Sequence, residues 1–107
     1  MRLSLAVLAS ATLLSTAAMA DPLANVYDNT LKVTAGGETV DWHINKDGTF
    51  TTSSGVSGTW ALKGEEICVT IGGAENCNPI EARNIGDTWT EPDGQGGTRS
   101  ATLVAGR

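Results

Sequence analysis

The sequence has few of the residues on which catalytic and metal sites depend. Its 107 residues include one histidine and two cysteines, and they contain no phosphate-binding glycine loop, dinucleotide-binding fingerprint or nucleophile elbow. The single histidine, His43, lies far along the chain from both cysteines, so the usual ligand sets of a metal site are missing. We therefore predict no cofactor and no metal, and we expect that the protein is not an enzyme.

Basic residues are also scarce, and none of them form a run interleaved with aromatic residues. Seven lysines and arginines stand against twelve acidic residues, for a net charge of −5. An acidic surface disfavours nucleic acid and anionic membranes, so we predict no nucleic-acid partner. The acidic loop around Asp87, Glu91 and Asp93 lacks the ligand spacing of a calcium loop. An exposed acidic turn is the simpler interpretation.

The only long apolar run lies at the N-terminus, at residues 3–14, between Arg2 and the small-residue site Ala18-Met19-Ala20. This pattern is typical of a secretory signal peptide, and about a dozen apolar residues are too few to span a bilayer. We predict a signal peptide over residues 1–20 and a single β domain over residues 21–107. The expected location is the bacterial periplasm or the extracellular space. No cysteine near the cleavage site could accept a lipid, so no membrane anchor is expected.

Helical periodicity is absent, whereas glycine turns recur roughly every ten residues between short runs that alternate apolar and polar side chains. This pattern predicts an all-β fold, an antiparallel meander of about eight short strands that forms a small barrel or a two-layer sandwich, with one disulfide. The expected strands lie near residues 30–35, 38–45, 49–53, 57–62, 66–71, 75–80, 86–91 and 98–104.

Each turn predicts a register that can be checked by asking which side chains reach a common face. A two-residue turn at Gly36-Gly37 pairs Val33 with Val40, a three-residue loop with Gly48 in the left-handed conformation pairs Ile44 with Phe50, and a Lys63-Gly64 turn sets Trp60 opposite Ile67 and Val56 opposite Ile71. The predicted core is Leu31, Val33, Val40, Trp42, Ile44, Phe50, Trp60, Leu62, Ile67, Val69, Ile71, Trp89 and Leu103.

The two cysteines, Cys68 and Cys77, lie equally far on either side of Gly72-Gly73. A two-residue turn there makes them direct partners in a pair without hydrogen bonds, where the Cα atoms approach to about 4.5 Å. A disulfide accepts that distance, and a secreted chain with two facing cysteines is expected to be oxidised. The closed loop suggests about 2–3 kcal/mol of stabilisation. A redox pair would instead be spaced Cys-x-x-Cys at the start of a helix.

The same register places Asn76 and Asn78 on the apolar side of the hairpin and the cysteines on the other side. Three interpretations are open. The disulfide lies on the outer face, the turn differs from the one assumed, or the interior contains polar groups. The third interpretation would suit a binding cavity.

The candidate binding residues are Trp89, His43, Asp41, Asn76 and Asn78. Trp89 is the tryptophan that could line a ligand cleft rather than pack in the core. Asp41 and His43 project from one face of a strand, opposite Trp42, and an Asp-His pair can orient an imidazole for base catalysis. No motif supplies a nucleophile, and an outer strand surface explains the pair better.

The stretches DGTF…SGTWALKGEEICVT and GDTW…GGTRSATLVAGR, with the cysteine pair between them, resemble a group of small, exported, largely uncharacterised β-domain proteins of alphaproteobacteria. The resemblance covers most of residues 21–107 and implies an exported β domain. It carries over no catalytic residue. The DGTF…G-T-W rhythm is also similar to lipocalin-like and other small β-barrel modules.

These features favour a non-catalytic periplasmic binding or accessory module, whose partner is a small ligand or an envelope protein. One alternative is an inhibitor of a secreted or host hydrolase, of the lysozyme or protease type. It would present the loops KDGT (46–49), TSSGVS (52–57) and EPDGQGG (91–97). A further alternative is an envelope structural protein that acts through a sheet edge.

Overall fold

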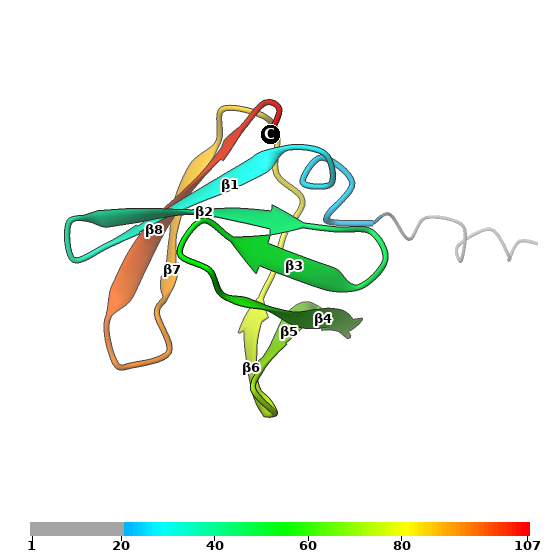
Figure 1. Cartoon of the computed structure of the whole chain (residues 1–107). Coiled ribbons are helices and arrows are strands. Elements are labelled where there is room, and N and C mark those ends of the chain that lie inside the picture. The colour runs from blue at the N-terminus through cyan, green and yellow to red at the C-terminus, as the bar shows by residue number, and fades with distance from the viewer. Residues whose placement is uncertain (1–20) are drawn as a thin grey trace, which may run out of the picture.

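The computed structural model describes residues 21–107, so the predicted signal peptide, residues 1–20, lies outside the described residues. The described part is all-β, and no helix in it is long and apolar enough to cross a membrane. Eight strands form one antiparallel sheet that curls into a nearly closed barrel (Figure 1). The strands are β1 (Thr30–Ala35), β2 (Glu38–Ile44), β3 (Thr49–Thr52), β4 (Ser57–Lys63), β5 (Glu66–Ile71), β6 (Ala74–Pro79), β7 (Thr88–Pro92) and β8 (Thr98–Val104).

The sheet is a meander that is closed part of the way by its last strand. The spatial order is β6-β5-β4-β3-β2-β1-β8-β7. The last strand, β8, pairs with β1 on one side and with β7 on the other. β6 and β7 are the two edges, and the irregular segment 80–87 connects them. The barrel therefore has one seam, between β6 and β7, at which no ladder of hydrogen bonds joins the strands.

Glycines with positive φ set most of the registers. Gly36 and Gly37 have φ of 60° and 81°, as a type I′ hairpin requires at both central positions, and they pair Val33 with Val40 as predicted. Gly48 has φ of 93°, and Ile44 pairs with Phe50, so the three-residue loop is also confirmed.

The predicted Lys63-Gly64 turn is wrong. The turn residues are Gly64 and Glu65, so Trp60 faces Val69 rather than Ile67. Gly64, with φ of 63°, occupies the first central position of the turn, where a type II′ turn requires positive φ. The slip is two residues long, so every side chain stays on the predicted face.

The core lies inside the barrel, around Phe50, Ile44 and Leu103. Leu23 and Val26, in the turn-rich segment 21–28 before β1, are buried in the same cluster. Strand alternation does not predict these two core residues, because they precede the first strand. Most other predicted core residues contact the cluster while keeping partial exposure; they are Leu31, Trp42, Trp60, Ile67, Val69 and Trp89.

Two of the predicted core residues are exposed. Leu62 is 38% exposed and Ile71 is 42% exposed, although both belong to the inner face of their strands. They lie near opposite ends of the β4–β5 pair. Alternation of side chains assigns a face but does not supply a facing wall.

The disulfide between Cys68 and Cys77 is present, and the two residues are direct cross-strand partners as predicted. Ile67 and Val69, the neighbours of Cys68, contact the core cluster, so the cysteines belong to the outer face of β5 and β6. Asn76 and Asn78 pair with Val69 and Ile67 and belong to the inner face. The predicted turn is therefore correct, and the inner face carries polar groups.

Candidate functional site

A cavity of about 290 Å³ lies in the barrel interior along the seam between β6 and β7. Protein interiors are close-packed, with few voids larger than a water molecule. This hollow is near the lower end of the ~300–1,000 Å³ typical of small-molecule sites. Its walls are mostly apolar and come from β1, β2, β5, β6, β7 and β8 and from the segments 22–26 and 79–83. The larger apolar side chains are Leu23, Val26, Leu31, Val33, Trp42, Ile44, Ile67, Val69, Ile80 and Trp89.

An ion pair lies on the wall of this cavity. Arg99 of β8 and Glu91 of β7 are direct cross-strand partners, and both Nε and Nη2 of Arg99 donate to Oε2 of Glu91 at 2.7 Å. Their side chains are 24% and 21% exposed. Glu91 Oε1 accepts a hydrogen bond of 2.9 Å from the indole Nε1 of Trp89. Both carboxylate oxygens of Glu91 are therefore occupied by protein donors.

Two arginines lie over aromatic rings in the same wall. The guanidinium carbon of Arg83 is 4.3 Å from the centre of the Trp89 ring, and that of Arg99 is 5.9 Å from the centre of the Trp42 ring. A cation over an indole face is attracted by the ring quadrupole. The side chains of Arg99, Glu91, Trp89 and Arg83 thus form a continuous series of contacts, here named the Arg99–Arg83 array.

Of this array, the sequence pattern indicated only Trp89 as a binding residue, and it assigned Glu91 to an exposed acidic turn. Glu91 is instead partly buried and paired with Arg99. Trp89 and Glu91 are two residues apart on β7 and therefore share a face, and Arg99 faces Glu91 across the β7–β8 pair. The missing information was the register, because Asp93–Gly97 form a five-residue loop that no single turn type specifies. With that register known, the Trp-x-Glu pattern on the inner face of β7, opposite an arginine of β8, would have predicted the ion pair. Arg83 lies in an irregular segment, where periodicity gives no signal.

Asn78 lines the cavity, and Asn76 lies farther along β6, beside the β7–β8 loop. A Cβ atom at Gly94 would stand 2.8 Å from Asn76 Nδ2, so the asparagine side chain reaches across the seam. Within residues 21–107 neither asparagine side chain makes a hydrogen bond to protein. Asn78 thus supplies a free amide to the cavity wall.

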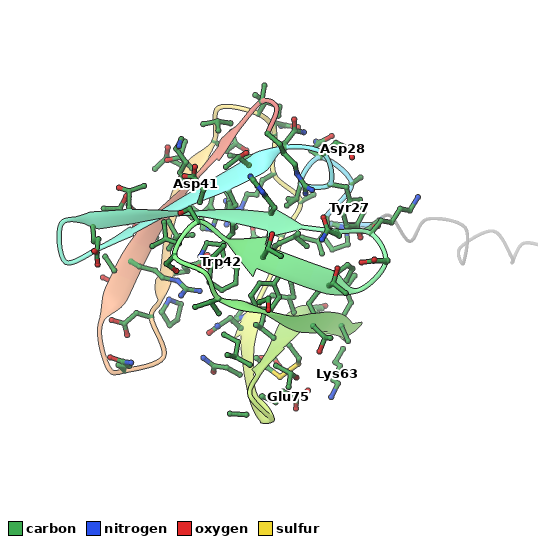
Figure 2. All side chains as sticks on the ribbon, in the orientation of Figure 1. Tyr27, Asp28, Asp41, Trp42, Lys63 and Glu75 are labelled. Carbon is green, nitrogen blue, oxygen red and sulfur yellow. A yellow bond between two sulfur atoms is a disulfide. The ribbon has the colours of Figure 1, made fainter. Side chains whose placement is uncertain are left out.

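Asp41 and His43 lie on the outer face of β2. Figure 2 labels Asp41 and Trp42, neighbours whose side chains leave opposite faces of the strand, and Trp42 lines the cavity. Asp41 pairs with Lys32 at 2.9 Å, and its backbone N–H donates to Ser53 Oγ. The structure therefore separates the candidate binding residues into Trp89 and the two asparagines at the interior and seam, and Asp41 and His43 on the outside.

A second hollow of about 330 Å³ lies at one end of the barrel. The β3–β4 turn contributes Ser54 and Val56 to it, and the β7–β8 loop contributes Asp93 and Gln95. Trp42 and Arg99 line both this hollow and the interior cavity. The pKa of Asp93 is lowered because its carboxylate accepts backbone N–H groups of Gln95 and Gly97.

The KDGT loop lies at the other end of the barrel, close to Arg107. Arg107 donates to the side chain of Asn45 and to the carbonyl oxygen of Ile44, the two residues that precede this loop. In Figure 1 the β2–β3 turn is on the right, whereas the β1–β2 turn and the β7–β8 loop are on the left. The three loops considered for enzyme inhibition are therefore divided between the two ends.

Within residues 21–107, Glu66, Cys68 and Cys77 are the one group of three potential metal ligands that lie close together. Both cysteines are in the disulfide, so their sulfur atoms are not available as thiolate ligands.

No protein-family model, curated protein or solved structure matches this chain. The resemblance to exported alphaproteobacterial β-domain proteins therefore stays a prediction.

Proposed function

We propose that this protein is a non-catalytic, exported binding module that holds a small, largely apolar molecule in the interior of its barrel. The observation that carries the proposal is the cavity of about 290 Å³ at the seam between β6 and β7. Apolar walls with a few fixed polar groups are typical of sites for small ligands. The predicted signal peptide and the disulfide support a location in the periplasm or outside the cell.

The entry route we propose is the seam. Elsewhere in the sheet the cavity lies behind continuous ladders of hydrogen bonds, whereas at the seam it is covered by the segment 79–83. Opening that segment would break far fewer backbone hydrogen bonds than parting two paired strands. Local openings of this kind are the least costly motions of a folded domain.

The test is titration of residues 21–107, with the disulfide formed, by the neutral fluorescent probe N-phenylnaphthylamine. We expect saturable binding that Val69→Phe abolishes, because the added ring fills the cavity that Val69 lines. Thr70→Phe is the matched control, since it adds the same ring to the next residue on the outer face of β5. Binding that is absent, or unchanged in a folded Val69→Phe protein, would contradict the proposal.

A second candidate function is inhibition of a hydrolase by the end of the barrel that carries the second hollow. The β3–β4 turn and the β7–β8 loop together line that hollow, which supports a surface built from two of the three candidate loops. We expect Val56→Glu to abolish any inhibition of lysozymes or proteases, because Val56 is an exposed apolar residue on that surface. No inhibition at micromolar concentration by the unmodified protein would remove this candidate.

Assembly through a sheet edge has less support. The exposed edges β6 and β7 each end in a proline, Pro79 and Pro92. Proline on an edge strand opposes the addition of a further strand.

A further inference from the structure

Arg83 lies at the wall of the mostly apolar cavity and has no counterion among residues 21–107. Its guanidinium lies over the face of Trp89, and it makes no hydrogen bond or ion pair with any side chain or carbonyl group of residues 21–107. A guanidinium on an aromatic face keeps its N–H groups available at its edge. Its backbone is also held, because Asn25 Nδ2 donates to the Arg83 carbonyl oxygen at 2.8 Å.

The other charged groups of the cavity wall do not neutralise Arg83. Glu91 has both oxygens occupied, by Arg99 and by Trp89. Glu81 is an exposed residue of the same segment, and it makes no ion pair with a described residue. Among the described residues, the hydrogen-bonding groups left free at the wall include the Arg83 guanidinium, which only donates, the Asn78 amide, which donates and accepts, and the exposed Glu81 carboxylate.

We propose that the molecule held in this cavity is a small amphipathic carboxylate, with its carboxylate bound by the Arg83 guanidinium and its apolar part against Leu31, Ile67 and Val69. This inference rests on the proposed binding function and adds the chemical class of the ligand. A planar guanidinium matches a carboxylate in a two-point contact, and the ring below it holds it in place. The part of the wall formed by Leu31, Ile67 and Val69 is apolar, so it suits a hydrocarbon tail.

The experiment compares two probes with the same hydrocarbon chain, octanoate and octanol, by isothermal titration at neutral pH. The disulfide-bonded protein over residues 21–107 is tested beside Arg83→Gln and Lys46→Gln. Lys46 is an exposed lysine of the β2–β3 turn, so its variant matches the change in net charge without touching the cavity. Octanol measures the apolar contacts alone, and it also reports whether the cavity of each variant is intact.

We expect the unmodified protein and Lys46→Gln to bind octanoate about tenfold or more tightly than octanol, since one charge-assisted contact contributes about that factor. Arg83→Gln is expected to bind the two probes equally and to keep its affinity for octanol. Equal binding of the two probes by the unmodified protein, or a preference that survives Arg83→Gln, would overturn the ligand class and leave the binding function standing. Failure to bind either probe, with no binding of N-phenylnaphthylamine, would overturn both proposals.

Discussion

The indole Nε1 of Trp89 donates a hydrogen bond of 2.9 Å to Oε1 of Glu91, two residues farther along β7, and both side chains line the interior cavity. An inward carboxylate beside an indole would be costly if it had no partners. Arg99 supplies the opposite charge from the neighbouring strand. The hydrogen bond between Trp89 and Glu91 therefore fixes the ring over which Arg83 lies. Through that ring, β7 contacts the segment that covers the seam.

Removal of the Glu91 charge should destabilise the fold. We expect Glu91→Gln to lower the free energy of unfolding by about 2 kcal/mol, because Arg99 loses its charged acceptor at a position that is only partly exposed. The double variant Glu91→Leu/Arg99→Met should recover part of that loss, since it removes both charges. Urea unfolding of the single and double variants measures the effect. A Glu91→Gln protein as stable as the unmodified protein would show that the ion pair contributes nothing.

The disulfide should provide a large part of the stability. Replacement of both Cys68 and Cys77 by alanine is expected to cost about 2–3 kcal/mol, because the unfolded chain regains the entropy of the closed loop. Thermal unfolding with and without a reductant checks this expectation. The reductant should lower the melting temperature of the unmodified protein and leave that of the double variant unchanged, which serves as the control.

Gly58 should tolerate no side chain. A Cβ atom there would overlap the carbonyl oxygen of Thr70 and come within 2.9 Å of the Phe50 ring, and Phe50 is one of the most buried residues of the core. We expect Gly58→Ala to lower the free energy of unfolding by about 1–3 kcal/mol, the range typical of overpacked cores. The matched control is Thr59→Ala, at the exposed neighbouring position, which should change stability little. Equal melting temperatures for the two variants would contradict the expectation.

Acid should weaken two of the turns. The pKa of Asp47 is lowered mainly by hydrogen bonds from the side chain and backbone of Thr49, and that of Asp93 by backbone N–H groups of Gln95 and Gly97. A carboxyl whose pKa is lowered in the folded state stabilises that state above its unfolded pKa, near 4. This contribution is lost as the pH falls through the folded pKa. The melting temperature of the double variant Asp47→Asn/Asp93→Asn should therefore fall less between neutral and strongly acidic pH than that of the unmodified protein. An identical acid dependence in the variant would count against this assignment.

Alkali should loosen the N-terminal segment. Burial, and then the hydrogen bond and charge of Asp21, raise the pKa of Tyr27 to about 12. Because the folded protein favours the neutral phenol, Tyr27 contributes to the free energy of unfolding. That contribution is fully present below the pKa of tyrosine in the unfolded chain, near 10, and it is lost as the pH rises towards 12. Tyr27→Phe removes the titrating group and should flatten the stability profile above pH 10. Titration of the tyrosine absorbance checks the pKa itself, and a midpoint near 10 in the folded protein would refute the shift.

Much of the local structure was predictable because it depends on short stretches of chain. Paired glycines at 36–37 and 72–73 adopt positive φ that most residues avoid, and this conformation sets the register of the strands on either side. The pairing of Cys68 with Cys77 then follows from their equal distance to the turn. Gly64 is the first central residue of the β4–β5 turn, whereas the predicted turn made it the second. The resulting two-residue shift leaves each side chain on its predicted face of the sheet, because side chains alternate with a period of two.

What only the tertiary structure decided is how far the walls of the barrel stand from one another. The sequence by itself determined the strands, their faces, most of their turns and the disulfide, since alternation and turn chemistry are local properties. The curvature of the sheet then closed β8 on β1, buried Leu23 and Val26, and left Leu62 and Ile71 exposed. It also brought Arg83 from an irregular segment onto Trp89. Those contacts join residues far apart along the chain or in irregular segments, so no local pattern specifies them, and the interior cavity that depends on them could not be predicted.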